Sequence, residues 1–369
     1  MEKHHSIQNK KNAEEEKRML KELFEKLRGK NKGQEVKTAA PVSKEPECAC
    51  KEPEKETEKT MVSTNIEEAI ARIDDWKGKK VTYEPVAGGI TNPNFKVFVD
   101  GTPVFLKIPG AGTDFIDRGN CHIANEIASK SGAGPKVLYF FPDTGVEVFE
   151  WLEGYRQVTF GDVYDETIFK KSVEAIRGFH AGTEKMPLVE SVFDQSRDMY
   201  NRAKEGRYLP SWNSKMLYLM DKIEEAFKHN DFELRPCHND FWTNNMMFNE
   251  ETNDLKIIDY EYGSMGDPYY DLGLYSAVNF LTEDFDVVMN TIYNNGVNDE
   301  IGFARLKLNK IAGDIKWAYW SLYQAMGSDL TDYMNWYGPK VARLQHMWTD
   351  PRVDLWLNKL NGKTPFYTK

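Results

Sequence analysis

The chain has few cysteines: Cys48, Cys50, Cys121 and Cys237 are the four among its 369 residues. Cys48 and Cys50 lie in a lysine- and glutamate-rich stretch, and the other two are far apart, so the spacing does not indicate a disulfide framework. A zinc site would need a second Cys or His pair close to Cys48 and Cys50, which the sequence does not offer. The pattern predicts free thiols in a reducing compartment, and hence a cytoplasmic protein.

The sequence also lacks long apolar runs and an excess of positive charge. No run is long enough to span a bilayer, and the start, MEKHHSIQNKKNAEEEK, has no apolar signal-peptide core. The formal net charge is −10, which argues against nucleic acid as the main partner. We therefore expect no transmembrane segment and no nucleic-acid partner. An acidic balance is compatible with a cationic small-molecule substrate.

Residues 1–62 differ from the rest of the chain. Leu20, Leu23, Phe24 and Leu27 are spaced so that they share one face of a helix, whereas residues 30–60 are rich in Lys, Glu and Pro. We expect a flexible charged tail with a short amphipathic helix in residues 13–29, exposed to solvent. The alternative is that this helix serves self-association or docks to a protein partner.

The most informative stretch runs from residue 237 to 271 and reads CHNDFWTNNMMFNEETNDLKIIDYEYGSMGDPYYD. Asn245 follows Asp240 by five positions, and Asp259 ends a short strand further on. Phosphoryl transfer uses this set: a carboxylate that orients the attacking hydroxyl, then an amide oxygen and a second carboxylate that hold magnesium. We predict that Asp240, His238 and Asn245 are catalytic and that Asn245 and Asp259 hold Mg²⁺.

The N-terminal half offers a matching phosphate-binding region. Thr91 and Asn92 belong to a glycine-bearing turn, GGITNPNF, between two expected strands, and such a turn lets backbone N–H groups approach phosphates. Lys107 ends the next expected strand, where it can neutralise nucleotide phosphates if a glutamate fixes it. We predict that Glu126, in a helical stretch, forms that ion pair with Lys107.

The segments HNDFWTNN and IIDYEYGSMGDPYYDLG resemble the choline/ethanolamine kinases, a family related to the aminoglycoside phosphotransferases and to protein kinases, with the closer likeness to bacterial choline kinases. The resemblance spans about residues 76–360 and implies ATP and Mg²⁺ as cofactors. It implies an α+β, two-lobed, protein-kinase-like fold. Residues 63–153 would form a nucleotide-binding N-lobe with an antiparallel sheet, and 154–369 a mainly helical catalytic and substrate-binding C-lobe. Glu150 and Leu152 match the hinge that recognises adenine.

Aromatic residues suggest the class of substrate. Trp317 and Trp320 are three positions apart in a helical stretch, and so share a face. A quaternary ammonium has no N–H donor, so aromatic faces and carboxylates must recognise it. Choline kinases carry a similar W-x-x-W-x-x-x-Q helix, and this resemblance predicts choline binding by Trp317, Trp320, Tyr262 and Glu261. An ordinary core role for the tryptophans is the alternative.

The resemblance therefore predicts an ATP- and Mg²⁺-dependent choline kinase that produces phosphocholine and ADP. Ethanolamine is the first alternative substrate, and a primary ammonium would call for hydrogen-bond acceptors in the pocket. A related phosphotransferase for aminoglycosides or thiamine would share the Asp/Asn/Asp set. A non-catalytic nucleotide-binding module is a further alternative, although the sequence retains all the phosphotransfer residues.

Overall fold

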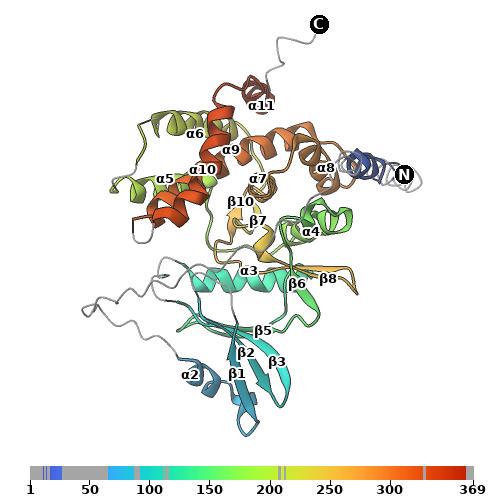
Figure 1. Ribbon diagram of the computed structural model, residues 1–369, viewed down its shortest axis with the longest axis vertical. Coiled ribbons are helices and arrows are strands. Elements are labelled where there is room, and N and C mark those ends of the chain that lie inside the picture. Colours follow the sequence, from blue (N-terminus) through green and yellow to red (C-terminus); the bar gives the residue numbers. More distant parts are fainter. Residues whose placement is uncertain are drawn as a thin grey trace, which may run out of the picture.

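The computed structural model describes residues 11, 14, 17–26, 65–86, 92–110, 113, 116–206, 209–211, 213–326 and 330–362. These residues form two lobes, with an antiparallel sheet at one end and most of the helices at the other (Figure 1). The fold predicted from the sequence, α+β and kinase-like, is confirmed. Among the helices within the described ranges, none has the length and apolar character needed to cross a bilayer.

The N-lobe contains a five-stranded antiparallel sheet in the order β1-β2-β3-β5-β4. Its strands are β1 (Val81–Pro85), β2 (Asn94–Val99), β3 (Thr102–Lys107), β4 (Val137–Phe141) and β5 (Val146–Glu150). The turn between β2 and β3 has Asp100 at φ 49° and Gly101 at φ 86°, the conformation that the Asp-Gly pair predicts for a tight hairpin. The hairpin directs the end of β3, and with it Lys107, toward the C-lobe.

Among the described residues, two α-helices and the one-turn helix η2 (Asp74–Trp76) accompany this sheet. α2 (Ile66–Ala71) begins with a capping box, because Asn65 accepts hydrogen bonds from the first turn and Glu68 accepts one from Asn65. α3 (Arg118–Ser131) starts at Asp117, which caps it, and ends at Gly132 with φ 77°. In Figure 1, α3 lies between the sheet and the C-lobe, so its first turn is positioned to reach both.

Short strands carry the polar segments of the C-lobe. β6 (Tyr155–Gln157), β8 (Met246–Asn249) and β9 (Asp254–Ile257) form one antiparallel sheet, and β7 (Arg235–Cys237) pairs with β10 (Ser264–Gly266). The one-turn helix η4 (Thr243–Asn245) precedes β8. The residues that follow β7 and β9 are therefore brought to the same region by two small sheets.

The remaining helices build the body of the C-lobe. They are η3 (Asp162–Tyr164), α4 (Glu166–His180), α5 (Val192–Ala203), α6 (Asn213–Lys228), α7 (Tyr269–Val278), α8 (Glu283–Tyr293), α9 (Glu300–Gln324), α10 (Leu330–Met347) and α11 (Arg352–Leu360). The long helix α9 is central, because it packs against α5, α7, α10 and α11. Its residues are mostly buried, so a charged side chain on α9 needs a specific partner.

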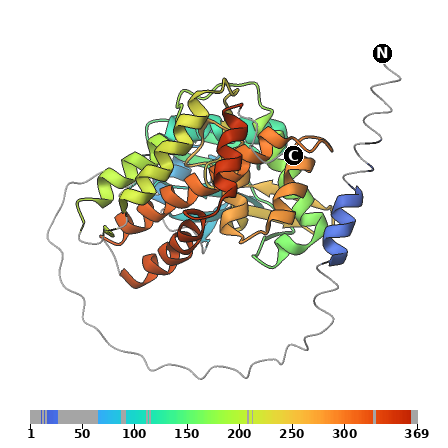
Figure 2. The same ribbon diagram turned by 90° about the horizontal axis from the view of Figure 1, so that it is seen from above.

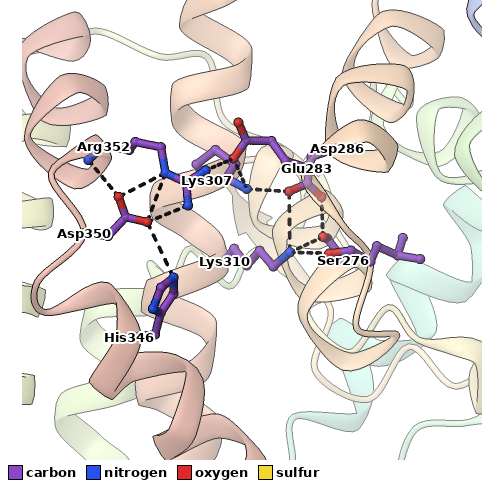
Figure 3. A network of polar contacts seen from close by, with 9 residues as sticks. Ser276, Glu283, Asp286, Lys307, Lys310, His346, Asp350 and Arg352 are labelled. Carbon is purple, nitrogen blue, oxygen red and sulfur yellow. Dashed lines mark hydrogen bonds and ion pairs between the residues drawn. The ribbon is translucent and has the colours of Figure 1, made fainter. Parts of the chain in front are cut away.

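A polar network ties the C-terminal helices together (Figure 3). Asp286 of α8 is fully buried and binds the ammonium group of Lys307 on α9 at 2.6 Å. Lys310 donates to Ser276 at 2.6 Å and to the Leu281 carbonyl at 3.0 Å, and Ser276 in turn donates to Asp286. These bonds fix α8 and α7 on α9 and satisfy a carboxylate that burial would otherwise disfavour.

The helix predicted near the N-terminus is present over residues 17–26, but it does not face solvent on all sides. Leu20, Leu23 and Phe24 are at most 6% exposed and belong to the C-lobe core. The Phe24 ring lies 5.8 Å from that of Phe285 in α8 and 6.3 Å from that of Phe169 in α4, and Figures 1 and 2 both show the helix beside α4 and α8. The expectation of a solvated helix is wrong, because its apolar stripe is covered by the same chain.

Candidate active site

The loop after β7 is held by one buried carboxylate. Asp271, in the first turn of α7, accepts hydrogen bonds from the backbone N–H groups of His238 and Asn239, both at 2.7 Å. His180, at the end of α4, contacts Asp271 through Nε2 at 2.9 Å. Asp271 and His180 are at most 2% exposed, so the brace is a rigid part of the core. Its consequence is a fixed backbone directly before Asp240.

The side chains of this loop are also engaged. The ring of His238 is fully buried; its Nε2 donates to the Ile258 carbonyl at 3.0 Å, and its Nδ1 accepts from the Asp240 N–H at 3.2 Å. Asn239, at φ 62°, donates from Nδ2 to the Tyr262 carbonyl at 2.8 Å. Because both nitrogens of His238 bond to backbone atoms, its ring positions the loop. The predicted catalytic role of His238 stays a prediction.

Asp240 and Asn245 lie together, as their spacing predicts. The Asn245 amide donates from Nδ2 to the Asp240 side chain at 3.0 Å and to the Asp240 carbonyl at 2.9 Å. Burial, and next the charge of Asp259, raise the pKa of the Asp240 carboxyl to about 7. An acid with a pKa near neutrality is suited to accept a proton from a hydroxyl.

Asp259 follows β9 and has φ 68°, a strained conformation for a residue other than glycine. Its carboxylate and the Asn245 amide oxygen are hard oxygen donors, which Mg²⁺ prefers. Since the Asn245 Nδ2 is already bonded to Asp240, the amide oxygen is the atom left to bind a metal. The donor set therefore fits a magnesium ion held by Asn245 and Asp259.

Lys107, at the end of β3 in the N-lobe, binds two carboxylates of the C-lobe. Its Nζ lies 2.7 Å from Asp259 Oδ1 and 2.9 Å from Glu261 Oε1. Although burial opposes its charge, these two carboxylates raise the pKa of the Lys107 ammonium above its ordinary value. Lys107 therefore carries a full positive charge next to the candidate metal ligand.

Glu261 binds two other side chains of the N-lobe in addition to Lys107. Its Oε1 accepts from Arg118 Nη1 at 2.7 Å and from Asn92 Nδ2 at 2.6 Å, and the Asn92 side chain also accepts from Gly110 N–H at 3.1 Å. Burial disfavours the charge on Glu261, but Lys107 and Arg118 outweigh it and lower the pKa of the carboxyl to about 2. We refer to Asn92, Lys107, Arg118, Asp259 and Glu261 as the charged cluster.

The predicted ion pair between Lys107 and Glu126 is wrong. Glu126 instead lies 3.6 Å from Lys130, one turn further along α3. The side of α3 that faces Glu261 carries Arg118 and Cys121, whose Sγ donates to the Glu261 carbonyl at 3.3 Å. Five residues beyond Cys121, Glu126 is rotated by about 140° around the helix. It therefore points away from Lys107, and Glu261 takes the place predicted for it.

Two further groups of predicted nucleotide-binding residues remain predictions. Thr91 lies outside the described residues. Glu150 ends β5, and its carboxylate accepts from the Lys136 N–H at 2.9 Å. Leu152 follows in the connection to β6 and is half-buried. A role for Glu150 and Leu152 in adenine binding would depend on backbone groups of this connection.

Aromatic rings gather near the loop that carries Asp240, because Tyr262 accepts a hydrogen bond from Asn239 through its carbonyl. The Tyr262 ring lies 5.7 Å from that of Trp317, which lies 5.4 Å from that of Trp320. Trp320 in turn lies 5.8 Å from Tyr333 and 6.0 Å from Trp336, both on α10. We call these five rings the aromatic group. The three predicted rings do come together, whereas Glu261, predicted to join them, binds Lys107 and Arg118 instead.

Sequence reasoning missed two cations. Arg118 was not among the predicted site residues, yet its side chain is 17% exposed and bonds to Glu261 and Thr113. Lys316 received no role, although its side chain lies against the aromatic group. The available signal was its position: Lys316 directly precedes Trp317 in a helix whose other residues are mostly apolar. A buried charge in such a stretch indicates a specific partner.

Comparisons with known proteins agree with this geometry. The model of the choline/ethanolamine kinase family matches residues 83–293. "Protein LicA" of Haemophilus influenzae is 25% identical over 260 residues, which cover 67% of this chain and 75% of that protein. "Probable choline kinase 3" of Arabidopsis thaliana is 27% identical over 217 residues, covering 54% of this chain and 60% of that protein.

Solved structures share the fold. A choline/ethanolamine kinase family protein from Mesorhizobium loti aligns with a TM-score of 0.69 and 24% identity, covering 79% of this chain and 97% of that one. At this identity the likeness concerns the fold alone. It agrees with the two-lobed arrangement in which the charged cluster joins the sheet-bearing lobe to the helical one.

Proposed function

Because this chain belongs to the choline/ethanolamine kinase family, and so is a kinase-like phosphotransferase that acts on an alcohol, we propose that it transfers the γ-phosphate of ATP to the hydroxyl group of choline. The observation that carries this choice is the aromatic group, whose Tyr262 is bound through its carbonyl to the loop that carries Asp240. The products are phosphocholine and ADP. The reaction belongs in the cytoplasm, where ATP and magnesium are supplied.

In the proposed reaction, Asp240 orients the choline hydroxyl and accepts its proton as the oxygen attacks the γ-phosphorus. The hydrogen bond from Asn245 to Asp240 keeps the carboxylate directed toward the acceptor. The brace of Asp271 and His180 keeps the backbone of this loop fixed, so little reorganisation is needed when the substrates meet.

Asn245 and Asp259 would hold Mg²⁺ between the nucleotide phosphates and the C-lobe. When bound, the ion neutralises charge that develops on the β- and γ-phosphate oxygens. Lys107 is within 3 Å of the same carboxylate, so nucleotide phosphates that approach Asp259 meet the Lys107 ammonium as well. Glu261 holds Lys107 and Arg118 in place while the phosphates enter.

Choline is favoured over ethanolamine because of the kind of surface next to Asp240. A quaternary ammonium cannot donate hydrogen bonds, and it is stabilised by ring faces within about 6 Å. The ring centroids of Tyr262, Trp317, Trp320 and Tyr333 follow one another at 5.4–5.8 Å. A primary ammonium would gain from several acceptors at the same place.

The test is ADP release, coupled to an optical readout, with Mg-ATP against choline, ethanolamine, thiamine and an aminoglycoside. We expect choline to give the highest kcat/KM and expect phosphocholine as the product by mass spectrometry. Faster turnover of ethanolamine would reassign the substrate within the family. Nucleotide binding without turnover of any acceptor would contradict the proposed function.

A further inference from the structure

Lys316 places a buried positive charge against the aromatic group. The residue lies on α9 directly before Trp317 and is 2% exposed. Its Nζ lies 4.5 Å from the centroid of the Trp317 ring, and 5.4 Å from those of Tyr262 and Tyr270. It also donates a long hydrogen bond of 3.5 Å to the Asn239 carbonyl. The ammonium is therefore held by ring faces and by the backbone next to Asp240.

This environment differs from that of another charged lysine on the same helix. Lys307 lies 2.6 Å from the carboxylate of Asp286, and Asp314 receives two hydrogen bonds from Arg343, at 2.7 Å from Nε and a shorter one from Nη2. Those contacts are ordinary buried ion pairs. Lys307 also lies over the rings of Phe303 and Trp356, but it has a carboxylate partner as well. Among the described residues, no carboxylate lies within ion-pair distance of Lys316, whose ammonium contacts ring faces and the Asn239 carbonyl. Ring faces are how proteins recognise ammonium ligands.

The charge on Lys316 persists near neutral pH. Burial lowers the pKa of its ammonium to about 8, whereas the charges of Asp240, Glu190 and Asp271 oppose this shift. At pH 7 most molecules therefore carry a cation at the Tyr262 and Trp317 end of the aromatic group. Two of the three rings predicted to receive a substrate cation are already in contact with one that belongs to the protein.

On the basis of the proposed function, we propose that Lys316 determines the specificity of the enzyme for its acceptor alcohol. Its ammonium occupies the Tyr262 and Trp317 end of the aromatic group and thereby confines the ammonium of the substrate to the Trp320 and Tyr333 end. Two like charges that share one set of rings repel each other, and this repulsion acts on a charged acceptor but not on a neutral one. Lys316 therefore lowers kcat/KM for charged alcohols relative to kcat/KM for neutral ones.

The experiment compares choline with its neutral isostere, in which a carbon atom replaces the nitrogen. The ratio of kcat/KM for the two alcohols is measured in the wild type, Lys316→Met and Lys316→Arg. An effect of Lys316 on proton transfer to Asp240 acts on both alcohols and cancels from the ratio. The Lys316 charge also lowers the pKa of Asp240, so its removal would reduce the negative charge of Asp240 and lower the ratio, which is opposite to the expected rise. For like charges separated by several ångströms of protein, removing one should raise the ratio roughly tenfold. Lys316→Arg keeps the charge and should keep the ratio of the wild type.

A ratio in Lys316→Met that equals the wild-type ratio, or falls below it, would overturn the proposal. Lys316→Gln, which retains a donor for the Asn239 carbonyl, provides a second uncharged variant if methionine disturbs the loop. Loss of the fold in both, measured by circular dichroism, would make Lys316 a structural residue and overturn the proposal equally. These outcomes are distinct from failure of the proposed function, in which the wild type itself would not phosphorylate choline.

Discussion

The charged cluster and the aromatic group are built in opposite ways. The charged cluster joins both lobes through short contacts between ionised groups, such as Lys107 to Asp259 at 2.7 Å and Arg118 to Glu261 at 2.7 Å. The aromatic group belongs to the C-lobe and consists of rings 5.4–6.0 Å apart. The charged cluster depends on the direction and charge of its contacts, whereas the aromatic group depends on the area and polarisable faces of its rings.

This difference predicts that the two regions divide the labour of substrate binding, with one region for each substrate. A triphosphate carries several negative charges, so a few directed cations and a metal bind it strongly. A quaternary ammonium has one diffuse charge and no donor, so several rings must share its recognition. Substitutions in the charged cluster should therefore affect the binding of ATP, those in the aromatic group should affect the binding of choline, and those of Asp240 should affect the chemical step.

The largest effect is expected for Asp240→Asn. The amide keeps the shape and the contact with Asn245 but cannot accept a proton, so kcat should fall by roughly 10²–10⁴-fold. Both Michaelis constants should change little, as steady-state kinetics will measure. Asp221→Asn, an exposed substitution on α6, serves as the control. A variant Asp240→Asn that retained wild-type kcat would remove Asp240 from the proposed mechanism.

A smaller effect is expected for Glu261→Gln. The variant loses the charge that holds Lys107 and Arg118, and the loss of charge-assisted contacts should raise the Michaelis constant for ATP roughly tenfold. Glu261→Asp should recover part of this loss, because the carboxylate is retained. An increase in the Michaelis constant for choline instead of that for ATP would contradict the assignment of Glu261 to ATP binding.

The smallest kinetic effect is expected outside both regions, in the N-terminal helix. Phe24→Ala removes a ring that packs on Phe169 and Phe285 and should lower the free energy of unfolding by about 3 kcal/mol. Chemical denaturation measures this loss, and the kinetic constants should remain those of the wild type. A change in either Michaelis constant would connect the helix to the active site and break the simple division between the two regions.

The sequence predicted those parts of the site that lie close together along the chain. Asp240, Asn245 and Asp259 come from one stretch, and local spacing was enough to bring them together. Trp317 and Trp320 share a helix face for the same reason. The hairpin at Asp100 was also predictable, because its conformation depends on the two residues in the turn.

What could not be predicted depends on the rotation and packing of distant elements. The choice between Glu126 and Glu261 as the partner of Lys107 was decided by the rotation of α3 about its axis. The amphipathic pattern around Phe24 predicted a helix but not the surface that covers it, because α4 and α8 come from much later residues. Lys316 was missed because only the packed structure brings Tyr262 and Tyr270 to its ammonium group.

The most direct test measures the Michaelis constants for ATP and choline in two variants, Glu261→Gln and Trp320→Leu, in one assay. The account predicts a crossed pattern: the constant for ATP rises in Glu261→Gln, and that for choline rises roughly tenfold in Trp320→Leu, while each variant retains the other constant within about twofold. If both variants raised both constants alike, the charged cluster and the aromatic group would act as one unit, and the division of labour proposed for this kinase would be contradicted.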